Sequence, residues 1–323
     1  MTAALAAAAQ GPAVQAFPPL ESAAFGVLWT VVGLFVGSFL NVCIHRFPIE
    51  GASVWSPSRS HCPKCGHQLT WSENIPVLSW VLLRARCSAC GTRIHWRYPL
   101  VEICGALAFY FAWRTAPPGD WAVMGVVTVV LCGLIVATFV DFDRFEIPDQ
   151  VSIGGMWAAP VASFFVPALH AEGPIALAMA QEGAVDGVSA LCECLGGMAL
   201  GGGFLYGVGW LGTRIYRTEA MGFGDVKLMA AGGGFIGTRG VALALVIAVI
   251  VAAVVGVLNM VRWYHVVRTR QRRRKLVNRG IPEAMRTARV VGRYLPFGPY
   301  LALGIGIVLL DWKDVLTLLP FGS

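Results

Sequence analysis

The chain is 323 residues long; 56% of its residues are hydrophobic and only 13% are charged, and its mean hydropathy is +0.66. This composition excludes a soluble globular domain and predicts a polytopic membrane protein whose surface largely faces lipid. The net charge of +7 does not indicate nucleic-acid binding, because the basic residues gather between apolar runs, where the positive-inside rule expects them.

The N-terminal stretch, residues 1–22, is rich in alanine and contains no Lys or Arg. A cleaved secretory signal needs a basic region at its start, so we do not expect one here. We predict instead that the stretch is an external N-terminal segment. The apolar run that follows, from Ala23 to Ile44, is long enough to cross about 30 Å of hydrocarbon as a helix. We therefore predict that it forms the first transmembrane helix.

A polar loop from His45 to Tyr98 comes next, with seven basic and two acidic residues. This excess of positive charge places the loop in the cytoplasm. It contains two C-x-x-C pairs separated by 21 residues, a spacing close to that of zinc ribbons. The predicted metal ligands are Cys62, Cys65, Cys87 and Cys90.

In a reducing compartment, four thiolates around one Zn²⁺ are favoured over two disulfides, and such a closed site is structural rather than catalytic. Gly66 and Gly91 directly follow the two pairs, which suits the tight turns of a zinc knuckle. Redox-active or unliganded cysteines are the alternative interpretation.

Seven further apolar runs predict transmembrane helices, so the expected fold is all-α, with about eight transmembrane helices and a small cytosolic zinc-binding hairpin loop. With the first loop in the cytoplasm, 22 of the 25 Lys and Arg residues fall on that side and both termini lie outside. The seven runs cover about residues 99–113, 121–140, 151–169, 191–211, 226–236, 240–263 and 295–310.

Two aspartates at membrane level are the candidate catalytic residues, because an ionisable group in such a position is functional by default. Asp141 ends a long apolar run, and Asp225 lies in M-G-F-G-D-V-K-L; the predicted topology puts both on the cytoplasmic side. Two neighbouring carboxylates share a proton, so that one activates water while the other protonates a carbonyl. Gly222 and Gly224 would let the backbones approach closely.

Each acidic residue also has a structural interpretation. Asp225 could cap the helix that follows it, and Asp149 could cap the next one after Pro148. Asp143 and Glu146 could be solvated loop charges. Asp141, directly after an apolar run, is the hardest to explain in this way.

Several stretches, taken together and in this order, resemble the bacterial type IV prepilin peptidases, which are leader peptidases and N-methyltransferases of pilus and type II secretion systems. The matching stretches cover most of the chain. They are G-S-F-L-N-V-C-I-H-R-F-P (residues 37–48), the paired C-x-x-C, E-N-I-P-V-L-S-W (73–80), R-Y-P-L-V-E (97–102), D-x-D-x-x-x-I-P-D (141–149), G-F-G-D-V-K-L (222–228) and P-F-G-P-Y (296–300).

The resemblance implies an aspartic endopeptidase with Asp141 and Asp225 as its catalytic pair. It implies an active site at the cytoplasmic face of the bacterial inner membrane, prepilin or pseudopilin substrates, and cleavage after the glycine that ends a short basic leader. It further implies N-methylation with S-adenosylmethionine. No sequence motif indicates which residues would bind this cofactor. The expected domains are an external segment (1–22), a first helix with the zinc loop (23–98) and a membrane-embedded peptidase domain (99–323).

Further polar residues are expected to support the site. An acidic rim of Asp143, Glu146 and Asp149 would attract the basic leader, and Gly222, Gly224 and Lys227 complete the supporting set. Other polar residues of the family-like stretches could either orient the loop or bind cofactor: Asn41, Arg46, Glu73, Asn74, Arg97 and Glu102.

Two departures from the family pattern stand out, a long external loop at 168–190 and the basic segment Arg268–Lys275. The basic segment is expected to bind anionic lipid headgroups or to act as a topology determinant. A different class stays open: a proton-coupled transporter or scaffold with a cytosolic zinc docking loop. A thiol oxidoreductase is disfavoured, because its cysteines would lie in the cytoplasm.

Overall fold

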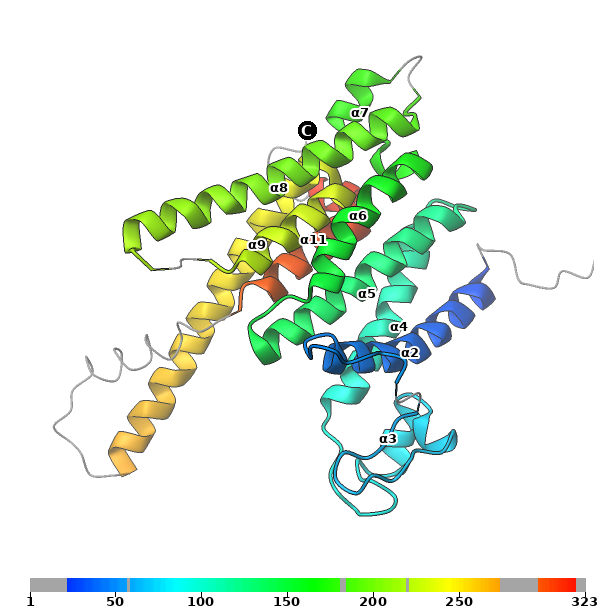
Figure 1. The fold of residues 1–323 in the computed structure, drawn as a ribbon, viewed down its shortest axis with the longest axis vertical. Coiled ribbons are helices and arrows are strands. Elements are labelled where there is room, and N and C mark those ends of the chain that lie inside the picture. Colours follow the sequence, from blue (N-terminus) through cyan, green and yellow to red (C-terminus); the bar gives the residue numbers. More distant parts are fainter. Residues whose placement is uncertain (1–21, 57–58, 181–183, 219–220, 274–295, 318–323) are drawn as a thin grey trace, which may run out of the picture.

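The computed structural model describes residues 22–56, 59–180, 184–218, 221–273 and 296–317, and this part of the chain is almost entirely helical, without extended strands (Figure 1). The all-α prediction is therefore confirmed. The α-helices are α2 (Ala23–Arg46), α3 (Leu78–Leu82), α4 (Arg97–Thr115), α5 (Trp121–Arg144), α6 (Asp149–Phe165), α7 (Pro174–Met179), α8 (Gly187–Tyr216), α9 (Phe223–Arg273) and α11 (Gly298–Thr317), with two 3-10 turns, η1 (Ser72–Asn74) and η2 (Pro167–His170).

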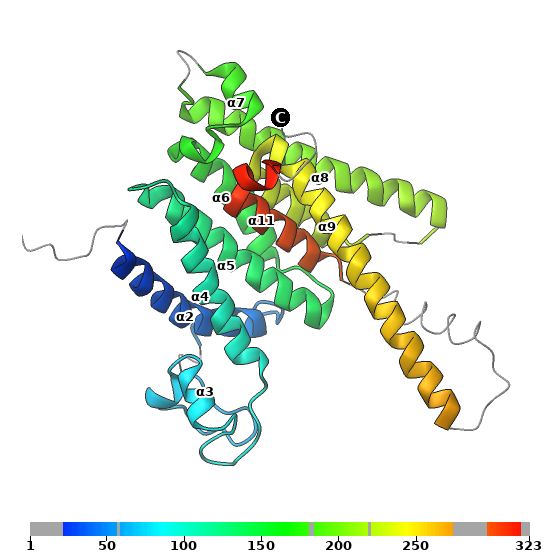
Figure 2. The same cartoon turned by 180° about the vertical axis from the view of Figure 1, so that it is seen from behind.

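Helices α2 and α4 pack against each other with glycines at the contact. A Cβ added at Gly105 would lie 2.6 Å from the carbonyl oxygen of Gly33, and one at Gly37 would lie 2.6 Å from Cα of Glu102. Neither position has room for a side chain, and small residues of this kind let helix backbones approach closely in a membrane. The cysteine loop, which contains α3, forms a separate lobe beside these two helices (Figures 1 and 2).

Helix α9 consists of two arms that fold back on each other at Gly237, whose φ of 67° and ψ of −179° are non-helical. A Cβ at Gly233 would lie 3.0 Å from Cγ2 of Val241, whereas eight residues of a straight helix would separate the two by about 12 Å. The sequence predicted two separate runs here, Val226–Ile236 and Gly240–Trp263, and the fold-back at Gly237 falls between them.

A buried glutamate holds this turn. Glu193, in the second turn of α8 and fully buried, accepts hydrogen bonds from the backbone amide (2.7 Å) and hydroxyl (2.6 Å) of Thr238 at the start of the second arm. Its other oxygen accepts from the amides of Ile175 (2.7 Å) and Ala176 (3.2 Å) in α7. One carboxylate thereby satisfies amides of two helix N-termini that would otherwise lack partners.

Helices occur at all of the predicted positions, but the number of membrane crossings stays a prediction. In the described part of the chain, four helices are long and apolar enough to span a membrane: Ala23–Arg46, Trp121–Arg144, Gly187–Tyr216 and Phe223–Val266. The external loop predicted at 168–190 contains η2 and α7. The N-terminal segment before Ser22 and the end of the basic segment, including Lys275, lie outside the described residues.

A stability prediction follows from the four hydrogen bonds of Glu193. The Glu193→Gln variant keeps the side-chain shape but turns one acceptor into an NH₂ group that faces backbone donors, so the free energy of unfolding should fall by about 1–3 kcal/mol. Thermal unfolding in detergent measures the change. The matched control is Glu50→Gln, at an exposed acid of the cysteine loop, for which a change within about 0.5 kcal/mol is expected. Equal melting temperatures for Glu193→Gln and the wild type would contradict the structural role of Glu193.

A topology prediction follows from the distribution of basic residues. A reporter fused after Leu69, in the cysteine loop, should report the cytoplasm, and one fused at Gly173, beside α7, should report the opposite side of the membrane. Paired alkaline phosphatase and fluorescent-protein fusions provide the measurement. Phosphatase activity from the Leu69 fusion would overturn the predicted orientation.

Candidate functional site

Asp141 lies in the last turn of α5, where the helix reaches the cytoplasmic end predicted from the sequence. The helix begins at the Asp120 cap, whose carboxylate accepts from the Val123 amide at 2.9 Å, and ends at Phe145, which has a left-handed conformation with φ of 57°. Asp141 is buried, and its Oδ2 atom has no hydrogen-bond partner among the described residues. A buried, unsatisfied carboxylate oxygen is rare in a folded protein and often marks a reactive group.

Asp225 lies in the first turn of α9, directly after the Gly222–Gly224 stretch. Its carboxylate is within electrostatic reach of Asp141, and both residues line one cavity of about 500 Å³. The structure therefore brings together two carboxylates that are 84 positions apart in the sequence. Because Asp225 is the third residue of α9, it is inside the helix and not at the N-cap position, where the structural interpretation would put it.

Close backbone packing surrounds the two carboxylates. A Cβ at Gly224 would lie 3.3 Å from Cβ of Ile147, and one at Gly298 would lie 2.5 Å from Oδ2 of Asp141. A Cβ at Gly222 would make an ordinary van der Waals contact, 3.8 Å from Oδ2 of Asp225. Gly298, at the start of α11, was not among the predicted site residues, although it lies in the P-F-G-P-Y stretch.

Two of the three predicted rim acids make ion pairs within the chain. Asp143 pairs with Arg97, and Asp149 pairs with Lys227. Glu146 makes no ion pair with any other described residue and lines the cavity, together with Asp149 and Lys227. The Asp149–Lys227 pair joins the first turn of α6 to the N-terminal part of α9, and thus helps to shape the cavity.

The four cysteines of the loop converge, as the sequence predicted. Their sulfur atoms all lie within 4.8 Å of one another, with 3.9 Å between Cys62 and Cys90 and 4.0 Å between Cys65 and Cys87. Four sulfurs at about 2.3 Å from a tetrahedral Zn²⁺ would be about 3.8 Å apart. None of these cysteines forms a disulfide, and the described arrangement fits a zinc ion.

The electrostatics of the thiols also favour a cation. Hydrogen bonds from the side chain and backbone of Thr92 lower the pKa of Cys90 to about 6. Although Cys65 accepts a hydrogen bond from the His67 backbone, desolvation and the neighbouring thiols raise its pKa to about 11. Four thiols at this separation cannot all ionise unless a positive charge lies among them.

The loop is built from two similar turns that carry these ligands. The Gly66 amide donates to the Cys62 carbonyl and the Gly91 amide to the Cys87 carbonyl, both at 2.9 Å, and both glycines have the positive φ that these turns require, 72° and 68°. Hydrogen bonds from the side chain of Ser88 and from Thr70 hold the pKa of Glu73 at about 2. Glu73 is thus ionised at neutral pH and fastens the loop internally.

Several polar residues of the family-like stretches were expected either to orient the cysteine loop or to bind cofactor. Most of them make contacts that orient the loop. The side chain of Asn41 donates to the Tyr98 carbonyl (3.1 Å), and Glu102 accepts from the Val77 amide (2.7 Å). Val77 has φ of 61°, which is unusual for a β-branched residue, so the bond to Glu102 stabilises a costly backbone conformation. Arg46 donates to the carbonyls of Ser53 and Val54.

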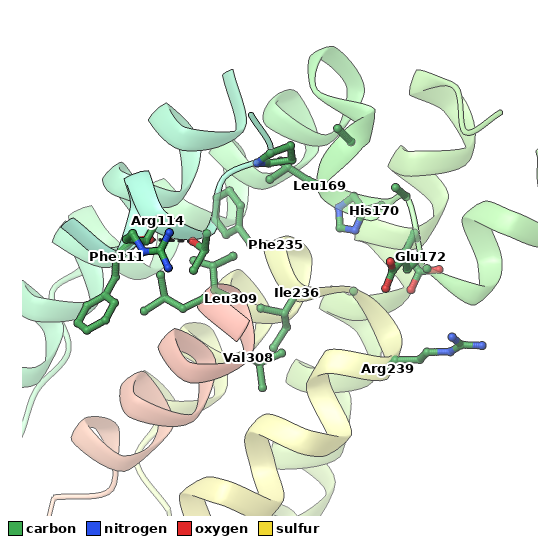
Figure 3. Close-up of a pocket in the computed structure, with 18 of the residues that line it drawn as sticks. Phe111, Arg114, Leu169, His170, Glu172, Phe235, Ile236, Arg239, Val308 and Leu309 are labelled. Atoms are coloured by element: carbon green, nitrogen blue, oxygen red, sulfur yellow. Dashed lines mark hydrogen bonds between the residues drawn. The ribbon is translucent and has the colours of Figure 1, made fainter. Parts of the chain in front are cut away.

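A larger cavity, of about 720 Å³, lies away from the aspartates (Figure 3). The ends of α4, η2, α9 near Gly237 and α11 surround it, and Arg114, His170, Glu172 and Arg239 are among its lining residues. Glu193 also lines it, although its carboxylate is already satisfied by four hydrogen bonds. Glu193 was not among the predicted site residues, although a lone acid within an apolar run marks it in the sequence.

Two family models match the chain. The bacterial peptidase A24 N-terminal domain matches residues 31–115, and the type IV leader peptidase family matches residues 128–257. The first match contains the four cysteines, and the second contains both aspartates. No solved structure is matched.

Curated relatives cover most of the chain. A prepilin leader peptidase/N-methyltransferase of Stutzerimonas stutzeri is 32% identical over 91% of this chain and 93% of the relative. A protein of the same name from Myxococcus xanthus is 38% identical over 73% of this chain and 63% of the relative. A type 4 prepilin-like proteins leader peptide-processing enzyme of Escherichia coli is 36% identical over 67% of this chain and 78% of the relative. The chain is therefore a multi-pass membrane protein that belongs to the type IV leader peptidase family.

Proposed function

We propose that this protein is an aspartic endopeptidase that removes the leader peptide from type IV prepilins or pseudopilins, with Asp141 and Asp225 as its catalytic pair. The observation that carries the proposal is the pair itself: two carboxylates from distant segments line one cavity at the ends of their helices. The names of the relatives support the substrate class, since each is a prepilin leader peptidase or leader peptide-processing enzyme.

The proposed mechanism uses the two aspartates in opposite protonation states. The ionised carboxylate removes a proton from a water molecule, whose oxygen attacks the carbonyl carbon of the scissile peptide, while the protonated carboxyl donates its proton to the carbonyl oxygen. Collapse of the tetrahedral intermediate breaks the C–N bond: the amine leaves with the proton returned by the first residue, and one hydroxyl of the intermediate gives its proton back to the second carboxylate, which restores the starting protonation states. The Oδ2 atom of Asp141 can take part in such a transfer, because it has no hydrogen-bond partner among the described residues.

The proposed orientation places the cavity at the cytoplasmic face of the bacterial inner membrane. The cysteine loop, with its excess of basic residues, and the end of α5 are on the same side in the predicted topology. By the same rule, the basic residues of a leader peptide would stay in the cytoplasm, so an active site on this side could cut the leader before it crosses the membrane. The acidic rim and the domain boundaries at residues 22 and 98 are part of this proposal.

A second activity, N-methylation of the new N-terminal amine, is proposed from the N-methyltransferase names of the relatives. S-adenosylmethionine would supply the methyl group. The proposed Zn²⁺ ion, held by Cys62, Cys65, Cys87 and Cys90, has a structural role, since four thiolates leave no open coordination position for a water or substrate.

The catalytic assignment predicts the effect of removing either carboxylate. Asp141→Asn and Asp225→Asn keep the side-chain shape but cannot transfer a proton, so each should lower the rate of prepilin cleavage at least about 10²-fold. Mass spectrometry of the cleaved substrate measures the rate. The matched control is Asp120→Asn, the same change at the opposite end of α5, where asparagine caps a helix as well as aspartate does. Near-normal cleavage by either variant would remove that aspartate from the pair.

The metal assignment predicts about one zinc ion per chain, which should be lost when Cys62 and Cys65 are both replaced by serine. Elemental analysis of the purified protein gives the zinc content, and the hairpin should become sensitive to proteolysis. Cys192→Ser, at a half-buried position of α8, is the control and should retain the metal. Zinc-free protein with disulfides between the C-x-x-C pairs would refute the metal assignment.

A further inference from the structure

Arg97 connects the cysteine loop to the last turn of the helix that carries Asp141. It is the first residue of α4, and its guanidinium makes two hydrogen bonds to α5: Nη1 donates to the Asp143 carboxylate and Nη2 donates to the Phe139 carbonyl at 2.7 Å. The guanidinium carbon also lies 5.0 Å from the centre of the Phe139 ring, within the range of a cation–π contact.

The two partners of Arg97 lie on either side of Asp141 in the sequence. Phe139 and Asp143 are four residues apart, so they share one face of the helix, whereas Asp141 is rotated by about 200° from each of them. The buried Asp141 side chain therefore points away from the face that Arg97 holds. A residue that binds this face fixes the rotation of the last turn of α5 and therefore the direction of the Asp141 carboxylate.

The end of α5 needs such support. The helix stops at Phe145 in a left-handed conformation, and the carbonyls of a last turn lack the next turn's amides. A cation at a helix C-terminus interacts favourably with those carbonyls and with the helix dipole. Arg144 in the last turn is one such cation. Arg97 adds a second one from a different helix and donates to the Phe139 carbonyl, just before the last turn, so the position of the turn depends in part on a tertiary contact.

Arg97 is itself held from both sides. On the loop side, the Ile94 amide donates to the Ala85 carbonyl at 2.7 Å and the Ile94 carbonyl accepts from the Trp80 indole at 3.2 Å. On the membrane side, the carbonyl of the next residue, Tyr98, accepts from Asn41 of α2 at 3.1 Å. The guanidinium thus starts from a fixed backbone, which makes it suitable for positioning another group.

We propose that Arg97 is a positioning residue for the peptidase reaction, which acts by holding the last turn of α5 so that Asp141 faces Asp225 across the cavity. The proposal rests on the catalytic role proposed for the two aspartates. It gives Asp143 a different function from the acidic rim: Asp143 serves as the partner of Arg97, and it is not among the residues that line the cavity.

The size of the expected effect follows from geometry and not from the energy of the ion pair. Both side chains are partly exposed, 24% for Arg97 and 44% for Asp143, and such pairs contribute little to stability. A displacement of about 1 Å in a catalytic group, however, can cost about 10²-fold in rate. The proposal therefore predicts a loss in kcat without a comparable loss in stability.

A double-mutant cycle tests the proposal, with the variants Arg97→Gln, Asp143→Asn and the combination of both. Arg97→Gln should lower kcat for prepilin cleavage at least about 10-fold with KM changed less than about twofold. The double variant should cleave no more slowly than Arg97→Gln alone, because the two residues act through one contact. Arg97→Lys, which keeps the charge but not the two-pronged geometry, should recover part of the rate.

The control is Arg214→Gln, which removes an arginine that lies over the Trp210 ring near the end of α8; kcat should not change. Melting temperature and zinc content confirm that each variant is folded. A rise in KM for Asp143→Asn, multiplying with the Arg97→Gln effect, would overturn the proposal and assign Asp143 to leader binding. Wild-type cleavage kinetics from Arg97→Gln would overturn it as well.

A second measurement does not depend on the activity. Hydrogen exchange of the amides at the end of α5, around Asp143–Phe145, should be faster in Arg97→Gln than in the wild type, while exchange in the middle of α5 stays the same. Unchanged protection at the end of the helix would refute the positioning role even if cleavage falls. If the wild type fails to cleave any prepilin, the proposed function fails, but the exchange result still decides whether Arg97 holds this turn.

Discussion

A carboxylate buried in an apolar helical bundle is stable only where donors surround it, and this requirement separates the buried acids of this protein into two kinds. Glu193 accepts four hydrogen bonds and ties the fold-back of α9 to α7. Asp141 is also buried, but its Oδ2 has no partner among the described residues. A carboxylate whose hydrogen bonds are all satisfied stabilises the fold, whereas an unsatisfied one can accept or donate a proton. The contrast therefore favours a reactive role for Asp141.

Close backbone packing explains how three separate segments can meet at the cavity. The end of α5, the start of α9 and the start of α11 meet with glycines at the contacts: Gly224 packs against Ile147, and Gly298 packs against Asp141. A side chain at Gly298 would collide with the Asp141 carboxylate. The same device joins α2 to α4 at Gly37 and Gly105, so the helix that starts at Arg97 is held firmly beside the site. Packing, more than sequence-local preference, therefore determines the geometry of the aspartate pair.

The sequence predicted the features that depend on local pattern. Apolar runs predicted the helices and the interruption near Gly237, and the cysteine spacing predicted the four converging sulfurs. The distribution of basic residues across the membrane predicted that Asp141 and Asp225 lie on the same side of it. Contacts between distant residues were not predictable: Arg97 and Asp143 are 46 positions apart, and Lys227 and Asp149 are 78 apart. The roles of Gly298 and Glu193 likewise depend on which helices pack together, which no single apolar run encodes. The number of crossings and the domain limits stay predictions.

The ion pairs also change how a basic leader peptide would be attracted. Pairing with Arg97 and Lys227 neutralises much of the charge of Asp143 and Asp149, so the rim that the sequence suggested is weaker than its three acids imply. The cavity nevertheless keeps a negative lining, because five acids face one cation, Lys227, among the lining residues that the structure describes. The acids are Glu50, Asp141, Glu146, Asp149 and Asp225. Charges in a confined cavity of low dielectric act over a longer distance than charges on an open surface. Glu50 and Glu146 make no ion pair with any other described residue. We therefore expect the cavity as a whole to attract a leader with Lys or Arg toward the aspartate pair.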